Sequence, residues 1–358
     1  MKKILVVINN FGIGGAERLV VDDINEMIRR GYDVNVLTFK QEKKASLLDE
    51  CRVSTDKLTF IEIRTIWEIR GWFNTFNYLK KINPDVVFSH LWFSNTIITP
   101  ICRLVGIKNV ITFEHNVYNS IKNKKMYFVD RLIQGLSKKI IAVSSAVKDS
   151  LIDHGIKEEK IIVINNGINL SKYKSERDFS YRQKLGIPEN AFVFTTVGRL
   201  ITQKGLDVLI KAFSRGLPEA LLLIVGEGPK EAELKKLSES LHMSGKIFFL
   251  GSRRDVPKIL EASNCFILAS RWEGLGIVVL EAMASRLPII ISDLKAGEDM
   301  IQNGFNGIVV AKEDYVALHL QMKRLMEDPA LQQYVSDNAY NKAKEFSIEN
   351  HVNNIMSL

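Results

Sequence analysis

Hydrophobic positions fall into short runs rich in Val and Ile, and these runs alternate with stretches of helical periodicity. In the first half, the runs predict strands at 3–8, 34–39, 85–89, 110–113, 140–143 and 161–164. Buried strands separated by helices are typical of a parallel sheet covered by helices on both faces. The first half therefore predicts an α/β domain of Rossmann-like type.

The alternation stops in a charged stretch at 171–180 and then restarts. The later runs predict strands at 192–197, 220–225, 247–250, 265–268, 288–291 and 307–310. A chain of 358 residues is too long for one typical core, so two domains are expected. We place a Rossmann-like domain at 1–167, a second at 168–345, and a terminal helix at 346–358 that can return to the first domain, with the linker in the charged stretch.

The segment 67–81 mixes aromatic and basic side chains in a helical pattern. Phe73, Phe76, Tyr78 and Leu79 are predicted to form the buried face of an ordinary helix. The alternative is a helix that lies in a membrane interface.

Charge is divided unequally along the chain, whose net charge is +8. Residues 1–175 hold 27 Lys and Arg against 18 Asp and Glu, whereas the rest holds 22 against 23. Lys122, Lys124 and Lys125 form one basic cluster within the first half. Such an excess fits a nucleic acid, an anionic membrane or an anionic substrate, but no nucleic-acid recognition motif accompanies it. We therefore expect no nucleic-acid partner and keep peripheral association with an anionic membrane as a hypothesis.

The first apolar run is too short for a signal peptide, and no run is suited to span a membrane. The three cysteines lack the paired spacing of a disulfide framework or a zinc site. We expect a cytoplasmic protein, with any membrane attachment at the inner face of the plasma membrane.

The first predicted strand ends in NNFGIGGAERLV, a glycine-rich turn that opens a helix. Gly12 and Gly14 match the first two glycines of a dinucleotide-binding fingerprint, but Glu17 stands at the third position. The N–H groups of such a turn can receive a phosphate, although it can also be a plain tight connection.

A stronger signal is VGRLITQKGLDVL, where Arg199 and Lys204 follow the carboxyl end of a predicted strand. Open α/β sheets bind ligands at this edge, and two cations can offset the charge of a diphosphate leaving group without a metal. No D-x-D sequence occurs, and Asp22 and Asp23 lie within a helical pattern. The sequence predicts a diphosphate site that needs no metal, against the alternative of two solvated cations.

The sequence SRWEGLGIVVLEAMA places Glu273 before a helix and Glu281 eight positions later inside it. Gly276 allows a tight turn that leaves the first N–H groups of the helix, near Ile277, open to a ligand. Glu281 follows Ile277 by four positions and therefore shares its helix face. A carboxylate in so apolar a helix needs a partner, which favours a binding role over a solvated one.

These segments together resemble the retaining glycosyltransferases of family four, of the bacterial cell-surface polysaccharide type, which have the GT-B fold of two Rossmann-like domains facing across a cleft. The resemblance rests on GGAER at 14–18, on Arg199 and Lys204, on GEGP at 226–229, and on the pair Glu273 and Glu281. It covers nearly the whole chain. Arg286 departs from the family pattern, in which a glycine commonly stands there, and this puts the local turn in doubt.

The resemblance implies a role for each motif. Glu273 would accept hydrogen bonds from hydroxyls of the donor sugar, and Glu281 would bind the ribose. Arg199 and Lys204 would bind the diphosphate. The turn at Gly14 and Gly15 would approach the phosphates, and the backbone at Leu275, Gly276 and Ile277 would complete the donor pocket. The nucleotide sugar is a substrate, and a UDP-sugar is expected because UDP is common in the family. No metal or other cofactor is expected.

A histidine completes the candidate catalytic set of His115, Glu273, Arg199 and Lys204. His115 lies in EHN at the end of a predicted strand, where the family carries a cleft histidine. It would contact the transferring sugar or position the acceptor hydroxyl, unless it is only a structural histidine. His90, at another strand end, is the weaker candidate.

The function implied is hexosyl transfer with retention to a hydroxyl of a glycan or of a polyprenyl-diphosphate-linked acceptor, in surface polysaccharide biosynthesis. Two alternatives remain at this point. One is a UDP-sugar 2-epimerase of the same architecture, which would need no acceptor. The other is a basic binding protein without catalysis.

Overall fold

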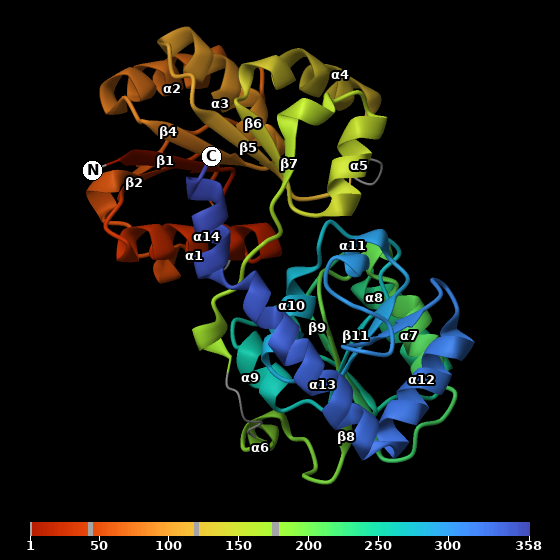
Figure 1. The fold of residues 1–358 in the computed structure, drawn as a ribbon. Helices are drawn as coiled ribbons and strands as arrows, with labels where there is room; N and C mark the ends of the chain where they lie inside the picture. Colours follow the sequence, from red (N-terminus) through yellow and green to blue (C-terminus); the bar gives the residue numbers. More distant parts are fainter. Residues whose placement is uncertain (1, 42–45, 118–121, 174–178) are drawn as a thin grey trace. The chain divides into compact units, whose positions relative to one another are not determined.

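The computed structural model describes residues 2–41, 46–117, 122–173 and 179–358. It divides into two compact units, Met1–Ile168 together with Ile348–Leu358, and Asn169–Ser347 (Figure 1). Residues 174–178 of the predicted linker lie outside the described part of the chain.

The first unit is built on a parallel sheet of seven strands in the order β3-β2-β1-β4-β5-β6-β7. The strands are β1 (Lys3–Ile8), β2 (Asp33–Thr38), β3 (Leu58–Phe60), β4 (Val86–His90), β5 (Val110–Glu114), β6 (Lys139–Ala142) and β7 (Ile161–Val163). The six predicted strands are confirmed within a residue or two at each end. The edge strand β3 was not predicted, because its three residues are too few to show a period.

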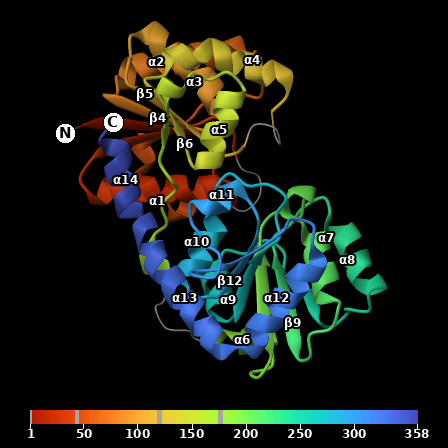
Figure 2. The same ribbon diagram turned by 45° about the vertical axis from the view of Figure 1, so that its right-hand side comes forward.

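Helices cover both faces of this sheet. They are α1 (Gly15–Arg29), α2 (Ile69–Ile82), α3 (Trp92–Val105), α4 (Lys124–Ile133), α5 (Ser145–Asp153) and α14 (Ile348–Met356). Helices α2, α3 and α4 lie on one face, and α1 and α14 lie on the other (Figure 2). The last helix thus packs in the first unit, where the Ile348 N–H donates to the Ile168 carbonyl at 2.9 Å.

The helix predicted at 67–81 exists as α2, but its buried face is smaller than expected. Leu79 is buried and Phe76 and Tyr78 are half-buried, whereas Phe73 is 64% exposed. The prediction for Phe73 was therefore wrong. Gly71, Thr75 and Leu79 form the inward stripe, so Phe73 falls on the outer side of the helix.

The second unit repeats the design with a parallel sheet in the order β10-β9-β8-β11-β12-β13. Its strands are β8 (Phe192–Val197), β9 (Ala220–Val225), β10 (Ile247–Phe249), β11 (Cys265–Leu268), β12 (Ile289–Ser292) and β13 (Ile308–Val310). Its helices are α6 (Tyr181–Leu185), α7 (Leu206–Phe213), α8 (Glu231–Ser240), α9 (Val256–Glu261), α10 (Ile277–Ala284), α11 (Lys295–Glu298), α12 (Tyr315–Glu327) and α13 (Pro329–Ala343). All six predicted strands are present here as well.

The turn before β12 forms although Arg286 stands where the family commonly has glycine. Arg286 adopts a left-handed conformation with φ of 53°, which costs free energy for a residue with a Cβ. Its guanidinium contacts α13, with 2.7 Å from Nη1 to Asp337 Oδ1 and 4.1 Å to the centre of the Tyr340 ring. These contacts offset part of the cost.

Among the described residues, no helix is both long enough and apolar enough to cross a bilayer.

Candidate active site

The loop after β8 carries Arg199 and Lys204 and rests on the backbone of the GEGP segment. The Leu200 N–H donates to the Glu227 carbonyl at 2.9 Å, and the Gly198 N–H to the Val225 carbonyl, also at 2.9 Å. Gly226 has φ of +132°, and a Cβ on it would lie 2.0 Å from the Gly198 carbonyl oxygen. Glycine is needed because only it allows this close approach. The GEGP segment thus fixes the loop with the two cations.

Glu273 lies where β11 leads toward α10 and is 7% exposed. Its Oε1 accepts from Lys204 Nζ and from Ser270 Oγ, both at 2.6 Å, and its Oε2 accepts from Gln203 Nε2 at 3.4 Å. The structure therefore brings Lys204 and Glu273 together as an ion pair. Ser270 and Gln203, which the sequence analysis missed, hold the carboxylate in place.

Arg199, in contrast, is exposed, and its guanidinium has no ion pair within the described ranges. It is available to an anion at the carboxyl end of β8. The Lys204 ammonium has three N–H groups, and one of them donates to Glu273. Both cations therefore keep donors for a ligand with negative charge.

A further residue that the sequence analysis missed, Arg271, ties the cation loop to its surroundings. Its guanidinium donates to the Thr202 carbonyl at 2.7 Å, to Asp207 at 2.8 and 2.9 Å, and to Glu313 at 2.5 and 3.0 Å. Hydrogen bonds from Arg271 and its charge help lower the pKa of Asp207, against an opposing effect of burial. Five such bonds make this loop a rigid platform for Arg199 and Lys204.

Helix α10 begins beside this platform. Gly276 is its N-cap with φ of +85°, and no side chain caps the helix. The first N–H groups of a helix have no partner inside it, so they can serve a ligand. Leu275 is buried, whereas Ile277 and Glu281 are half-buried. The prediction of an uncapped helix start at Gly276 matches this local geometry.

In the first unit, Gly14 is the N-cap of α1, and Gly15 is its exposed first residue. A Cβ on Gly14 would lie 2.2 Å from Oε2 of Glu17, so a side chain there would only require the flexible end of Glu17 to move. Asp22 and Asp23 lie inside α1, as expected, and both are buried.

His115, just after β5, and His90, the last residue of β4, lie side by side. His90 Nδ1 and His115 Nε2 are 3.2 Å apart, and the His90 ring stacks on Phe113 with centroids 4.1 Å apart. Burial, helped by the nearby charge of His351, lowers the pKa of His115 to about 3. Burial also holds the pKa of His90 well below its usual value, with His115 and His351 adding to the effect. Both rings are therefore neutral at neutral pH, and His115 Nδ1 is buried without a partner among the described residues.

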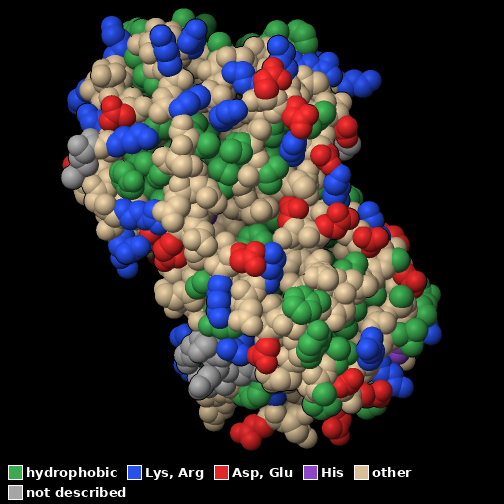
Figure 3. All heavy atoms as spheres, viewed as in Figure 1, with side chains coloured by type: hydrophobic (Ala, Val, Ile, Leu, Met, Phe, Trp, Pro, Cys, Tyr) green, Lys and Arg blue, Asp and Glu red, His purple; other side chains and the backbone are tan. Residues whose placement is uncertain are grey.

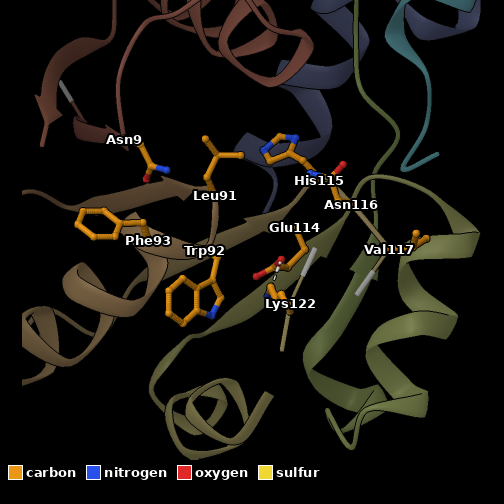
Figure 4. A pocket seen from close by; sticks show the side chains of 9 residues that line it. All are labelled: Asn9, Leu91, Trp92, Phe93, Glu114, His115, Asn116, Val117 and Lys122. Atoms are coloured by element: carbon orange, nitrogen blue, oxygen red, sulfur yellow. Dashed lines mark hydrogen bonds and ion pairs between the residues drawn. The ribbon is translucent and has the colours of Figure 1, made fainter. Parts of the chain in front are cut away.

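A pocket of about 230 Å³ opens beside His115 at the carboxyl ends of β1, β4 and β5 (Figure 4). It is lined by Asn9, Leu91, Trp92, Phe93, Glu114, His115, Asn116, Val117 and Lys122. Leu91 has φ of 72° and ψ of 149°, a conformation that is rare for residues other than glycine. Backbone strain of this kind concentrates at functional sites.

The wall of this pocket contains a buried charged cluster. Lys122 Nζ lies 3.0 Å from Glu114 Oε2 and 2.8 Å from Asp130 Oδ2, and its side chain is 5% exposed. Burial raises the pKa of Glu114, while Lys122 opposes the rise and Asp130 adds to it. Lys122 is therefore not the solvated cation of a basic cluster, and that interpretation was wrong. Glu114 and Asp130 were missed, because nothing in the local sequence shows that one lysine joins them.

Family models match the two halves of the chain. The model described as Glycosyltransferase Family 4 matches residues 13–172, and the model described as Glycosyl transferases group 1 matches residues 178–342. The chain is 30% identical over 304 residues to an uncharacterised glycosyltransferase of Methanocaldococcus jannaschii, covering 79% of this chain and 76% of that protein.

Two further relatives match almost the whole chain. A protein of Escherichia coli named UDP-Gal:alpha-D-GlcNAc-diphosphoundecaprenol alpha-1,3-galactosyltransferase is 26% identical over 362 residues, which cover 97% of this chain and 93% of that protein. The crystal structure of HepE of Anabaena in complex with UDP and glucose has a TM-score of 0.90 at 20% identity, covering 100% of this chain and 99% of that one. The fold is that of the GT-B glycosyltransferases, and the chain belongs to glycosyltransferase family 4.

Proposed function

We propose that this glycosyltransferase moves a hexose, with retention and without a metal, from a UDP-sugar to a hydroxyl of a glycan or lipid-linked oligosaccharide in surface polysaccharide biosynthesis. The observation that carries the proposal is the platform in the second unit, where Arg199 and Lys204 lie at the end of β8 and Lys204 pairs with Glu273. Two relatives support the nucleotide and the kind of acceptor. One is the E. coli protein named for UDP-Gal and a diphosphoundecaprenol substrate, and the other is HepE bound to UDP and glucose.

In this proposal, Arg199 and Lys204 offset the negative charge that develops on the leaving diphosphate. Glu273 accepts hydrogen bonds from hydroxyls of the donor sugar. The N–H groups at Gly276 and Ile277 complete the donor pocket, and Glu281 takes the ribose hydroxyls. Glu273 is already oriented by Ser270 and Gln203, so little reorganisation is needed when the donor binds.

Retention is proposed to proceed by attack on the face from which the diphosphate leaves. The acceptor oxygen forms its bond to the anomeric carbon as the bond to the diphosphate breaks, and the hydroxyl proton passes to the departing phosphate oxygen. His115 is neutral, so it orients the acceptor hydroxyl through Nδ1 and does not supply charge. A trapped covalent sugar on the protein would contradict this path.

A lipid-linked acceptor requires access to a membrane, and α4 has an outer face suited to one. Lys124 and Lys125 are exposed on this helix, beside Phe128 and Leu132, which are 62% and 65% exposed. Figure 3 shows Lys and Arg side chains gathered over the part of the first unit that carries α2, α3 and α4. Exposed apolar side chains among cations are typical of peripheral attachment to anionic lipid. We propose this role for the outer face of α4.

The test is transfer and donor hydrolysis across a panel of UDP- and GDP-sugars, with and without EDTA, using a membrane lipid extract as acceptor source. Wild type is compared with Glu273→Gln and with Glu239→Gln, a matched change at an exposed position of α8. We expect the wild type to turn over a UDP-sugar in the presence of EDTA. Glu273→Gln should do so at least about 100-fold more slowly than the wild type, and Glu239→Gln at the wild-type rate.

Each part of the proposal can fail separately in this experiment. Loss of turnover in EDTA contradicts metal independence, and an inverted anomeric product contradicts retention. Conversion of a UDP-sugar to its epimer without acceptor would favour a 2-epimerase. If no sugar nucleotide is bound or turned over, the proposed function is wrong.

A further inference from the structure

The pocket beside His115 has one aromatic wall and one charged wall. Figure 4 shows Trp92 and Phe93 on the side formed by the start of α3, and Glu114 and Lys122 on the side that follows β5. Its volume of about 230 Å³ lies below the range of about 300–1,000 Å³ for pockets that hold drug-sized ligands. A single sugar ring suits this size, and aromatic side chains are the usual partners of its apolar faces.

The charge of Lys122 is already compensated within the wall. Its ammonium contacts the carboxylates of both Glu114 and Asp130, and Asp130 also accepts from Trp92 Nε1 at 2.9 Å. Burial and the Asp130 charge raise the pKa of Glu114, so the cluster of two carboxylates and one ammonium has a net negative charge above that raised pKa. Lys40 lies over the Phe93 ring, 4.2 Å from its centre, and is not among the residues that line the pocket.

The groups that remain open to a ligand match a hydroxyl. Glu114 accepts from Lys122 at one oxygen and from Asn95 Nδ2, at 3.4 Å, at the other, while a carboxylate has about four acceptor sites. His115 Nδ1 has no hydrogen-bond partner in the described part of the chain, and it is a donor or an acceptor depending on the bond of Nε2 with His90. A hydroxyl both donates and accepts, so it can satisfy Glu114 and either tautomer of His115.

A phosphate at the same place would be penalised. Ionised phosphate oxygens only accept hydrogen bonds, and they would face the Glu114 carboxylate in a wall whose one lining cation among the described residues, Lys122, is already paired. Like charges placed together in a partly buried site repel, and we expect phosphate to bind at least about tenfold more weakly than a hydroxyl for this reason. The wall therefore discriminates by charge as well as by shape.

We propose that this pocket holds an uncharged sugar ring of the acceptor, and that Glu114 is a specificity-determining residue that admits hydroxyls and excludes phosphate. The inference rests on the proposed function, because it assigns the pocket to the acceptor of the transfer reaction. It also means that the diphosphate of a lipid-linked acceptor lies outside the pocket, beyond the ring that enters it.

The test uses the full chain saturated with UDP and a set of neutral probes beside charged ones. The probes are the methyl glycosides of glucose, galactose, mannose, N-acetylglucosamine and N-acetylgalactosamine, and the 6-phosphates of the same glycosides. Dissociation constants are measured by ligand-observed NMR. At least one neutral glycoside should bind wild type at least about tenfold more tightly than its phosphate.

Glu114→Gln keeps the shape of the side chain and removes its charge, so it should lower this sugar-to-phosphate ratio to near one. Asp130→Asn removes charge from the same wall without lining the pocket, and should lower the ratio by a smaller factor. Glu159→Gln, a matched change at an exposed position of the first unit, should leave the ratio unchanged. The second variant keeps the test decisive if Glu114→Gln does not fold.

Equal binding of sugar and phosphate by wild type overturns the proposal, as does an unchanged ratio in both pocket variants or failure of every neutral probe to bind. Titration with UDP reports separately on the donor platform. If wild type does not bind UDP, the proposed function fails. If UDP binds and the ratio does not respond to Glu114 or Asp130, only the assignment of the pocket fails.

Discussion

Asp23 of α1 and His351 of α14 form a buried pair within the first unit, and breaking this pair should destabilise that unit strongly. The Asp23 Oδ2 and His351 Nε2 atoms are 3.5 Å apart, and the two side chains are 2% and 1% exposed. His351 Nδ1 also lies 2.8 Å from the Asn165 carbonyl oxygen. Burial alone would lower the pKa of His351, but the Asp23 carboxylate outweighs this and raises it above its usual value.

The magnitude follows from the distance and the burial. Two unit charges at the observed separation of 3.5 Å attract by about 5 kcal/mol at an effective dielectric constant of about 20. The cost of desolvating both groups offsets much of this attraction, so the intact pair adds little to the free energy of unfolding. Removing one member nevertheless leaves a buried charge without compensation, at a cost of about 3–5 kcal/mol. Asp23→Ala and His351→Ala should each show this cost, whereas the double variant should lose at least about 2 kcal/mol less than their sum.

The double-mutant cycle is measured by urea unfolding, followed through the tryptophan fluorescence of Trp67, Trp72 and Trp92 in the first unit. A raised pKa of His351 in the folded state means that its contribution fades as pH rises through the folded value. Burial raises the pKa of Asp23 as well, so the pair is also lost in acid as Asp23 is protonated, and the prediction applies from neutral pH upward. The coupling should therefore shrink in alkaline buffer. A cycle between Asp23 and His154, whose ring contacts Ser150 and Tyr127, is the control. Additivity within about 0.5 kcal/mol at neutral pH, or a coupling that grows with pH, would refute the reasoning.

Three other substitutions test the donor loop, the strained turn and the membrane surface. Gly226→Ala places a Cβ 2.0 Å from a backbone oxygen, so UDP affinity by calorimetry should fall at least about tenfold; unchanged affinity would contradict the role of this glycine. Arg286→Gly relieves strain at φ of 53° but loses the contact with Asp337, so the unfolding free energy should change by less than about 1 kcal/mol in thermal melts. Phe128→Ser combined with Leu132→Ser should reduce cosedimentation with phosphatidylglycerol vesicles severalfold at unchanged UDP affinity; equal sedimentation would remove α4 from the proposal.

The sheets could be predicted from the sequence because parallel strands buried on both faces must be apolar along their whole length. Strands such as Phe192–Val197 and Ala220–Val225 were placed correctly for that reason. The order of the strands could not be obtained in this way, since hydrophobicity does not state which strands are neighbours. The exposure of Phe73 was missed for a related reason, because the apolar pattern of a helix does not show how wide its covered stripe is.

The segments of the proposed donor platform could be recognised in the sequence because each of them is local. Arg199 and Lys204 lie within one loop, and Glu273 and Gly276 lie within one turn, where glycines mark a special backbone. The contact between these segments was not visible. Sixty-nine positions separate Lys204 from Glu273, and the ion pair forms only because β8 and β11 are neighbours in the sheet.

The proposed acceptor pocket beside His115, in contrast, is built from segments that lie far apart in the sequence. It is assembled from segments that follow β1, β4 and β5, and its charged wall depends on Asp130 from α4. A substitution at Asn9, Trp92 or Lys122 alters this pocket without touching any residue of the donor platform. Because the two sets lie in separate units, the proposal implies that acceptor preference can change while donor binding and folding of the second unit are retained. The proposal for the reaction therefore rests on the motif at Glu273, whereas the proposal for the acceptor rests on the geometry around Glu114.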